Sequence, residues 1–244
     1  MRIAVAGATG LTGRAVTAAI QVRGGEVVAL ARSSGVDLLT GAGVAAAVHG
    51  ADAVIDVTNA DSAEQLETMT RSLVEASRAA GVRQVVLLSI IAAPRLPTRP
   101  HYVGKLAQER LVVHSGLPYT IVRAAQYFEY GEMMVGWRRQ GDVARLENAM
   151  LQPVDVEDVG DALAEAAMRP AVNGIVEVAG PEQISLPELA RRTLAARGDT
   201  IHVGETSSDG ADTALLATAF LPSPGAIIGR RRFVDWLARV PRSH

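Results

Sequence analysis

The chain has 244 residues, of which 48% are hydrophobic, and its formal net charge is -2 at pH 7. This length and apolar content fit one large domain, or one domain with a small appendage, built around a sizeable core. The nearly balanced charge gives no indication of a nucleic-acid partner or an anionic membrane surface. The chain contains no cysteine, which excludes disulfides, thiol nucleophiles and cysteine metal ligands.

The first residues read RIAVAGATG, which is a strand pattern that starts at once. No basic segment with a long apolar run and a cleavage site precedes it, so we expect no signal peptide. No run of about 18 uncharged apolar residues occurs, so we expect no membrane span. A cytoplasmic protein without a membrane partner is therefore our expectation.

Short apolar runs alternate with longer helix-like runs over the first half of the chain. The expected strands cover residues 3–6, 26–31, 53–57, 84–89, 119–123 and 175–178. The expected helices cover residues 12–23, 44–49, 62–80, 105–114 and 156–167, with another that Ser185 caps. This alternation predicts an α/β fold, a doubly wound, mostly parallel Rossmann-like sheet with helices on both faces.

The alternation of strands and helices stops after residue 124. We expect residues 1–124 to form the Rossmann-like core, with residues 151–168 packing back on it. Residues 125–150 look irregular, and with residues 169–244 they are expected to form a small C-terminal subdomain on the substrate side. The last part of the chain, RRRFVDWLARV, is expected to be a terminal helix.

A glycine-rich loop, GATGLTG, directly follows the first expected strand and opens the first expected helix. In this context Gly7 permits a tight turn, Gly10 lets the backbone approach a pyrophosphate, and Gly13 lets the helix pack against the strand. Free amides at the start of a helix favour an anion. Thr9, Leu11 and Thr12 offer further backbone or hydroxyl donors. The loop predicts a dinucleotide-binding site.

The residue after the second expected strand indicates which dinucleotide is bound. An acidic side chain there would bind the ribose 2′-hydroxyl of NAD, but this chain has Arg32. A guanidinium suits a 2′-phosphate through charge-assisted hydrogen bonds. Arg14, next to Gly13, could assist from the start of the helix. We therefore predict NADP(H) as the cofactor in preference to NAD(H).

Together with Arg32, several segments resemble the atypical short-chain dehydrogenase/reductases, most closely their NmrA-like, NAD(P)H-binding branch. These segments are GATGLTG at 7–13, VDL at 36–38, VVLLS at 85–89, KLAQERLV at 105–112, SGLPYTIVRA at 115–124, QPVDVEDVGDAL at 152–163 and VAGPEQISLPELA at 178–190. The resemblance implies a doubly wound sheet that binds NADP(H) and a C-terminal part that shapes the substrate site. It also implies that Asp37 and Leu38 border the adenine and that Thr58 and Asn59 lie along the cofactor.

The segment RPHYVGKLAQER contains the candidate acid/base residues. In related enzymes a tyrosine four residues before a lysine donates the proton, the lysine also holds the nicotinamide ribose, and a serine at the preceding strand end binds the carbonyl. Here Ser89 ends the VVLLS strand, and Tyr102 precedes Lys105 by three residues. His101 precedes it by four. Both spacings place a side chain on the face of Lys105, so either residue could be the donor, with Tyr102 preferred.

Large apolar side chains follow the last strand of the expected core. The candidate substrate residues are Gln126, Tyr127, Phe128, Met133, Met134 and Trp137. Such a set suits a flat or aromatic substrate such as a quinone, and it would equally serve to pack the subdomain. The histidines lack any metal-ligand spacing such as HExxH, so we predict no metal site.

Three functions remain open from the sequence. The first is an NADPH-dependent oxidoreductase that reduces a quinone or another small carbonyl compound. The second is a non-catalytic NADP(H)-binding redox sensor that regulates a partner protein, as some NmrA-like relatives do. The third is a dehydratase or epimerase that uses the cofactor without net oxidation. A small-molecule substrate is expected in the enzymatic cases, and a homodimer stays open.

Overall fold

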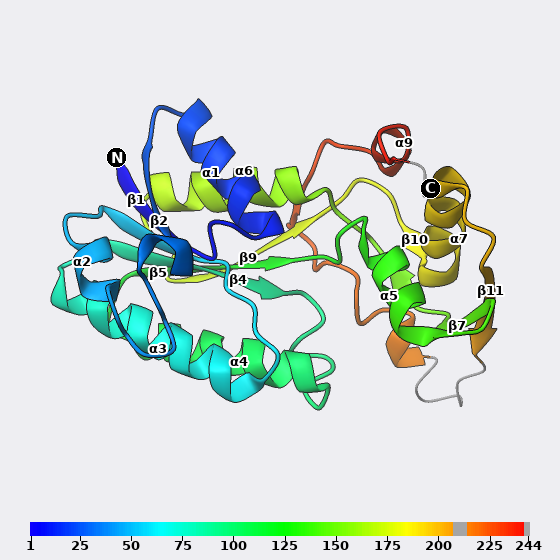
Figure 1. Ribbon diagram of the computed structural model, residues 1–244, viewed down its shortest axis with the longest axis horizontal. Helices are drawn as coiled ribbons and strands as arrows, with labels where there is room; N and C mark the ends of the chain where they lie inside the picture. The colour runs from blue at the N-terminus through cyan, green and yellow to red at the C-terminus, as the bar shows by residue number, and fades with distance from the viewer. Residues whose placement is uncertain (207–213, 242–244) are drawn as a thin grey trace. The chain divides into compact units, whose positions relative to one another are not determined.

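The computed structural model describes residues 1–206 and 214–241 of the chain (Figure 1). The chain divides into two compact units. The first unit comprises Met1–Ala124 and Val156–Val176, and the second comprises Ala125–Asp155 and Glu177–His244. Residues 207–213 and 242–244, which fall in the expected C-terminal subdomain, lie outside the described residues. Within the described part of the chain, no helix is both long and apolar enough to cross a membrane.

The central sheet has seven strands in the order β12-β9-β5-β4-β3-β1-β2. Their bounds are β1 Arg2–Ala6, β2 Glu26–Leu30, β3 Ala53–Asp56, β4 Gln84–Ile90, β5 Tyr119–Ala124, β9 Gly174–Ala179 and β12 Ile227–Ile228. The pairs β1–β2, β1–β3, β3–β4, β4–β5 and β9–β12 all run parallel. The predicted doubly wound α/β fold is confirmed, because non-consecutive strands lie side by side and helices connect them.

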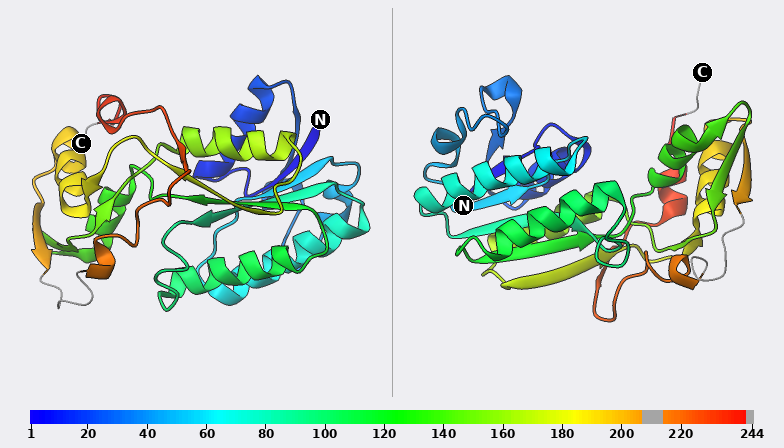
Figure 2. Two further views of the ribbon diagram at one scale, coloured as in Figure 1. Left: turned by 180° about the vertical axis from the view of Figure 1, so that it is seen from behind. Right: turned by 90° about the horizontal axis from the view of Figure 1, so that it is seen from below.

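Helices cover both faces of the sheet in the first unit (Figures 1 and 2). Helices α1 (Leu11–Val22) and α6 (Val156–Met168) pack together on one face. The other face carries α2 (Val44–Val48), α3 (Ala63–Ala79) and α4 (Pro100–Val113). The core strands are buried on both sides, as parallel strands between two helical layers must be.

Local capping signals set some helix boundaries as expected. The Ser62 hydroxyl accepts a hydrogen bond from the Gln65 amide at 3.1 Å and starts α3. Helix α4 begins at Pro100, five residues before Lys105, which confirms the helix start that the proline before His101 indicates. Proline fits the first helical turn because its missing N–H would have no intrahelical partner there. His101 and Tyr102 are therefore both part of the helix.

The second unit has its own small sheets and helices. It contains α5 (Tyr130–Arg138), β6 (Arg139–Gln140), β7 (Val143–Glu147), β8 (Met150–Leu151), β10 (Ile184–Ser185), α7 (Leu186–Arg197), β11 (His202–Thr206) and α9 (Phe233–Leu237). The expectation that residues 125–150 are irregular is wrong. Helix α5 occupies part of this range, and β7 pairs both with the neighbouring β6 and, in parallel, with β11 about 60 residues later. A partner as distant as β11 leaves no local signal. The terminal helix α9 is shorter than expected.

Candidate functional site

The strand order reverses at β1. The chain passes from β1 outward to β2 and then returns to β3 on the other side of β1. In open parallel sheets ligands bind at such a switch point, beyond the carboxyl ends of the strands. Gly7 follows β1 with a φ of 82°, and an added Cβ would lie 3.1 Å from the Val57 carbonyl oxygen. A glycine is thus needed where the loop turns against the end of β3.

The glycine loop forms a tight cradle at the start of α1. The Gly10 amide donates to the Gly7 carbonyl at 3.0 Å. A Cβ at Gly13 would lie 2.0 Å from the same carbonyl oxygen, so the helix can approach the loop only with glycine there. Gly10, the residue before the helix, offers no side chain to its first amides. Thr9 and Leu11 are exposed beside them, and Thr12 is buried. This cradle fits the pyrophosphate of a dinucleotide.

Arg32 lies just beyond the end of β2. Arg32 opens a short 3-10 turn, η1 (Arg32–Ser34), and is exposed. Among residues 1–206 and 214–241, no carboxylate lies within ion-pair distance of it. Arg14 is engaged otherwise, because its Nη1 donates to the Thr9 carbonyl at 2.7 Å. The fold therefore presents an uncompensated positive charge where an NAD-binding protein would carry a carboxylate.

The residues expected beside the cofactor have different local roles. Asp37 accepts a hydrogen bond from the Leu39 amide at 2.8 Å, which makes a turn, and Leu38 is buried in the core. The Thr58 hydroxyl donates to Asp56 Oδ1 at 2.6 Å, so this hydroxyl is committed inside the protein. Asn59, the next residue, is exposed.

Lys105 is buried between the ends of β3 and β4. Its Nζ donates to the Thr58 carbonyl at 3.0 Å and to the Leu88 carbonyl at 3.4 Å. Burial lowers the pKa of Lys105 to about 8, against the opposing influence of Asp56 and Glu109. The chain has 24 lysine and arginine residues together, and Lys105 is the only lysine among them. That count is a sequence signal that motif reasoning missed.

A buried polar network lies close to Lys105. Asp56 Oδ2 accepts from the Thr70 hydroxyl at 2.8 Å, and the Gln108 amide donates to that hydroxyl at 2.7 Å. These side chains come from β3, α3 and α4. Sequence reasoning missed them, although Asp56 ends an apolar strand and Gln108 lies one turn after Lys105. The network fixes α4 against the strand ends and so fixes the position of Lys105.

The candidate acid/base residues differ in exposure. Tyr102 is only 5% exposed, whereas His101 is exposed, and their ring centroids are 6.0 Å apart. Partial desolvation lowers the pKa of His101, and the positive charge of Lys105 lowers it further. Ser89 is fully buried, and its hydroxyl has no hydrogen-bond partner in the described part of the chain.

A buried ion pair joins α4 to β5. Arg123 Nε and Nη2 donate to the two carboxylate oxygens of Glu109 at 2.9 and 2.7 Å. Both side chains are largely buried, at 14% and 8% exposure for Arg123 and Glu109. Glu109 lies one helical turn after Lys105, and Arg123 is the register partner of Ser89 in the sheet. No local pattern predicts this pairing, because it joins two elements.

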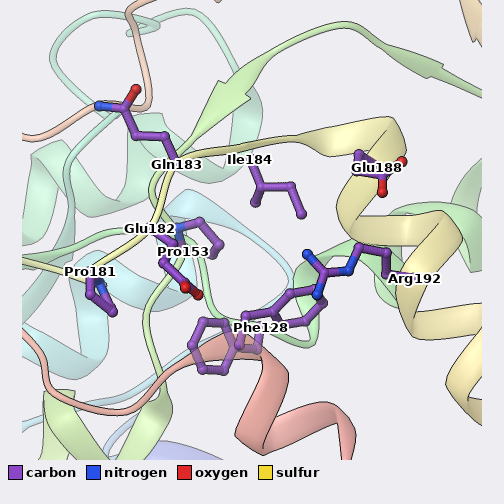
Figure 3. Close-up of a pocket in the computed structure, with 9 residues that line it drawn as sticks. Phe128, Pro153, Pro181, Glu182, Gln183, Ile184, Glu188 and Arg192 are labelled. Carbon is purple, nitrogen blue, oxygen red and sulfur yellow. The ribbon is translucent and has the colours of Figure 1, made fainter.

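The predicted substrate residues all fall in the second unit. Phe128 lines a cavity of about 240 Å³ together with Pro153, Pro181, Glu182, Gln183, Ile184, Glu188, Arg192 and Phe233 (Figure 3). We call it the α7 cavity, because α7 supplies Glu188 and Arg192. The other candidates, Gln126, Tyr127, Met133, Met134 and Trp137, do not line it. Met134 is buried, whereas Met133 and Trp137 are exposed on α5. Among the described residues, no group of three or more His, Asp or Glu side chains could hold a metal ion.

A parallel sheet with a glycine cradle at its switch point and a basic residue after β2 defines a Rossmann-type dinucleotide-binding protein. A sequence model of the NAD(P)H-binding family matches residues 7–170. The chain therefore belongs to this NAD(P)H-binding family, which confirms its classification with the atypical short-chain dehydrogenase/reductases. No curated protein sequence matches the chain.

Solved structures share the fold at low sequence identity. The NADPH-dependent quinone oxidoreductase of Escherichia coli, complexed with NADPH, is 16% identical with a TM-score of 0.73, covering 97% of this chain and 98% of that one. A short-chain dehydrogenase/reductase superfamily protein of Agrobacterium tumefaciens with bound NAD is 18% identical with a TM-score of 0.70, covering 98% and 95%. The UDP-N-acetylglucosamine 4-epimerase of Bacillus cereus is 19% identical with a TM-score of 0.70, covering 97% and 94%. These likenesses show the fold alone.

Proposed function

We propose that the chain is an NADPH-dependent oxidoreductase that reduces a quinone or a small carbonyl compound. The observation that carries this proposal is Lys105, a buried cation held between the carbonyls of Thr58 and Leu88 at the cofactor edge of the sheet. A buried charge is costly to the fold, so its presence at this edge favours a functional role. The quinone oxidoreductase that shares the fold supports the same reaction class.

Each part of the first unit has a proposed role in binding. The glycine cradle and the first amides of α1 hold the pyrophosphate. Arg32 pairs with the 2′-phosphate, and Lys105 binds the nicotinamide ribose. NADPH supplies the hydride, and the protein positions and protonates the substrate. The preference for NADPH rests on the uncompensated charge of Arg32.

The electrostatics favour Tyr102 over His101 as the proton donor. At pH 7 Lys105 is mostly protonated, because its pKa is about 8. This positive charge lowers the pKa of His101, so the imidazole is mostly neutral and a weak donor. Tyr102 lies three residues before Lys105 on α4, a spacing that places both side chains on one face of the helix. We therefore assign proton transfer to Tyr102.

A second candidate function is a non-catalytic NADP(H) sensor. The observation that favours it is the full burial of Ser89, which keeps the hydroxyl expected to bind the carbonyl away from a substrate. In that case Lys105 and Arg32 still serve to bind the cofactor.

Two measurements separate these functions. The first is NADPH oxidation with a panel of quinones and carbonyl compounds, where sustained turnover that Tyr102→Phe lowers by about 100-fold or more supports the reductase. Tight binding of both NADP⁺ and NADPH with no turnover on any compound supports the sensor.

The second measurement is titration with NADPH and with NADH. If NADH binds as tightly as NADPH, Arg32 has no role in selecting the cofactor. Arg78→Gln is the control, because Arg78 is an exposed arginine in the last turn of α3, away from the glycine loop and β2.

A further inference from the structure

One wall of the α7 cavity carries Arg192, whose guanidinium does not form the ion pair with Glu188 that its position on α7 predicts. Glu188 precedes Arg192 by four residues on α7, a spacing that normally pairs the two side chains. Instead, Glu188 faces Arg191 at 3.8 Å, and the Arg192 guanidinium lies over the Phe233 ring, with Cζ 5.2 Å from the centroid. Over the part of the chain that the structure describes, no carboxylate lies within ion-pair distance of Arg192.

The other charges at the cavity are compensated. Glu182 accepts from Nε and Nη2 of Arg232, at 3.0 and 2.5 Å, and Glu188 has Arg191 near it. Figure 3 shows the Arg192 guanidinium and the Glu182 carboxylate directed toward the cavity from opposite sides. Arg192 is therefore the charge at this cavity that still lacks a counter-ion. A guanidinium stacked on an aromatic face keeps its in-plane N–H groups available to a planar anion.

The walls beside this guanidinium are apolar and aromatic. Phe128 and Phe233 have ring centroids 5.3 Å apart, and Pro153, Pro181 and Ile184 form the rest of the apolar lining. The polar lining consists of Glu182, Gln183, Glu188 and Arg192. An apolar cavity of about 150 Å³ holds a benzene molecule. At about 240 Å³, the α7 cavity has room for one ring and a small polar group. Apolar and aromatic walls with a few placed polar groups are the usual character of a small-molecule site.

We propose that the α7 cavity binds a small planar organic anion, whose simplest form is an aromatic carboxylate. The ring packs on Phe128 and Phe233, and the carboxylate pairs with Arg192. The site lies entirely within the second unit and uses no residue of the glycine cradle. It shares Phe128 with the expected substrate residues but no residue with the proposed cofactor site, so anion binding and NADPH binding can fail separately.

Three isosteric probes test the proposed charge preference: benzoate is anionic, benzamide is neutral and benzamidine is cationic. Titration calorimetry on the full chain without nucleotide is expected to show benzoate binding at least tenfold more tightly than the other two. Trp236 stacks on Phe233 with centroids 5.7 Å apart, so benzoate should also change its fluorescence. The other tryptophan, Trp137, is 71% exposed, and Trp137→Phe as the parent variant assigns the signal to Trp236.

Three variants of α7 locate the binding. Arg192→Gln is expected to weaken benzoate binding at least tenfold, and Glu188→Gln to strengthen it about twofold or more by removing a nearby negative charge. Arg191→Gln, the matched control on the same helix, should change it less than threefold. Benzoate that binds no tighter than benzamidine, that is indifferent to Arg192→Gln, or that gives no heat at millimolar concentration would overturn the proposal.

Discussion

The presence of a lysine, and not an arginine, at position 105 is the most informative single feature of the proposed site. Every basic residue other than Lys105 is an arginine, although arginine and lysine serve equally well at many exposed positions. Arginine cannot lose its proton in a protein, and its planar fork needs more room than a compact ammonium. Lys105 instead fits between two backbone carbonyls and titrates near pH 8. A residue that binds the nicotinamide ribose and lowers the pKa of the proton donor has to be a compact cation, and a lysine at this position meets that requirement.

Replacement of Lys105 should separate stability from function. Because burial lowers its pKa from 10.5 to about 8, the charged form costs the fold on the order of 3 kcal/mol at neutral pH. We expect Lys105→Met to leave the free energy of unfolding unchanged or to raise it by about 1–3 kcal/mol. The same variant should weaken NADPH binding at least tenfold. Urea denaturation and fluorescence titration measure the two effects.

The pH dependence gives an independent check of the same residue. Below pH 8 Lys105 is charged in both the folded and the unfolded chain, and the folded state carries the full desolvation cost. Between pH 8 and 10.5 the folded state releases the proton first, so the unfolded state binds more protons and the contribution of Lys105 to stability rises with pH. Lys105→Met should remove this rise. A variant that keeps the wild-type slope would show that another group causes it.

At the scale of elements, the β1–α1 junction depends on contacts that exclude any side chain. We expect Gly13→Ala to abolish NADPH binding and to destabilise the fold by several kcal/mol, because its Cβ would meet the Gly7 carbonyl oxygen at 2.0 Å. Gly136→Ala is the control. This glycine lies in α5 with no atom within 4 Å of an added Cβ, so alanine should stabilise the helix by roughly 0.5–1 kcal/mol. Thermal unfolding with and without NADPH tests both, and equal losses would contradict the close-packing argument.

The ion pair between α4 and β5 also has a measurable consequence. Breaking a buried ion pair by removing one partner is strongly destabilising, so Glu109→Gln should cost about 3 kcal/mol of stability. It should also lower the pKa of Lys105 below 8, because Glu109 favours the charged ammonium. The exposed pair of Glu67 and Arg71 on α3 is the control, and Glu67→Gln should cost about 0.5 kcal/mol or less. If Glu109→Gln destabilises the chain without moving the Lys105 pKa, the pair is only structural.

At the scale of the whole molecule, local signals predicted the first unit well. The glycine spacing, Ser62 and the apolar strands act within a few residues, so the sequence predicted the Rossmann-like sheet and its family. What it missed depends on distant partners. Strand β7 forms against β11, and the network of Asp56, Thr70 and Gln108 joins three elements. The α7 cavity was only partly predicted, through Phe128, because Arg192 and Phe233 come together only in the folded chain.

The single lysine allows a direct test of the central claim, that a buried lysine forms part of the dinucleotide site. With ¹³C-labelled lysine, the protein should give one lysine side-chain resonance set, which can be followed by NMR from pH 6 to pH 11. We expect an apparent pKa of about 8 in the free protein, and a clear shift of the resonance when NADP⁺ is added but not when benzoate is added. A pKa near 10.5, with a resonance that NADP⁺ leaves unchanged, would contradict the account.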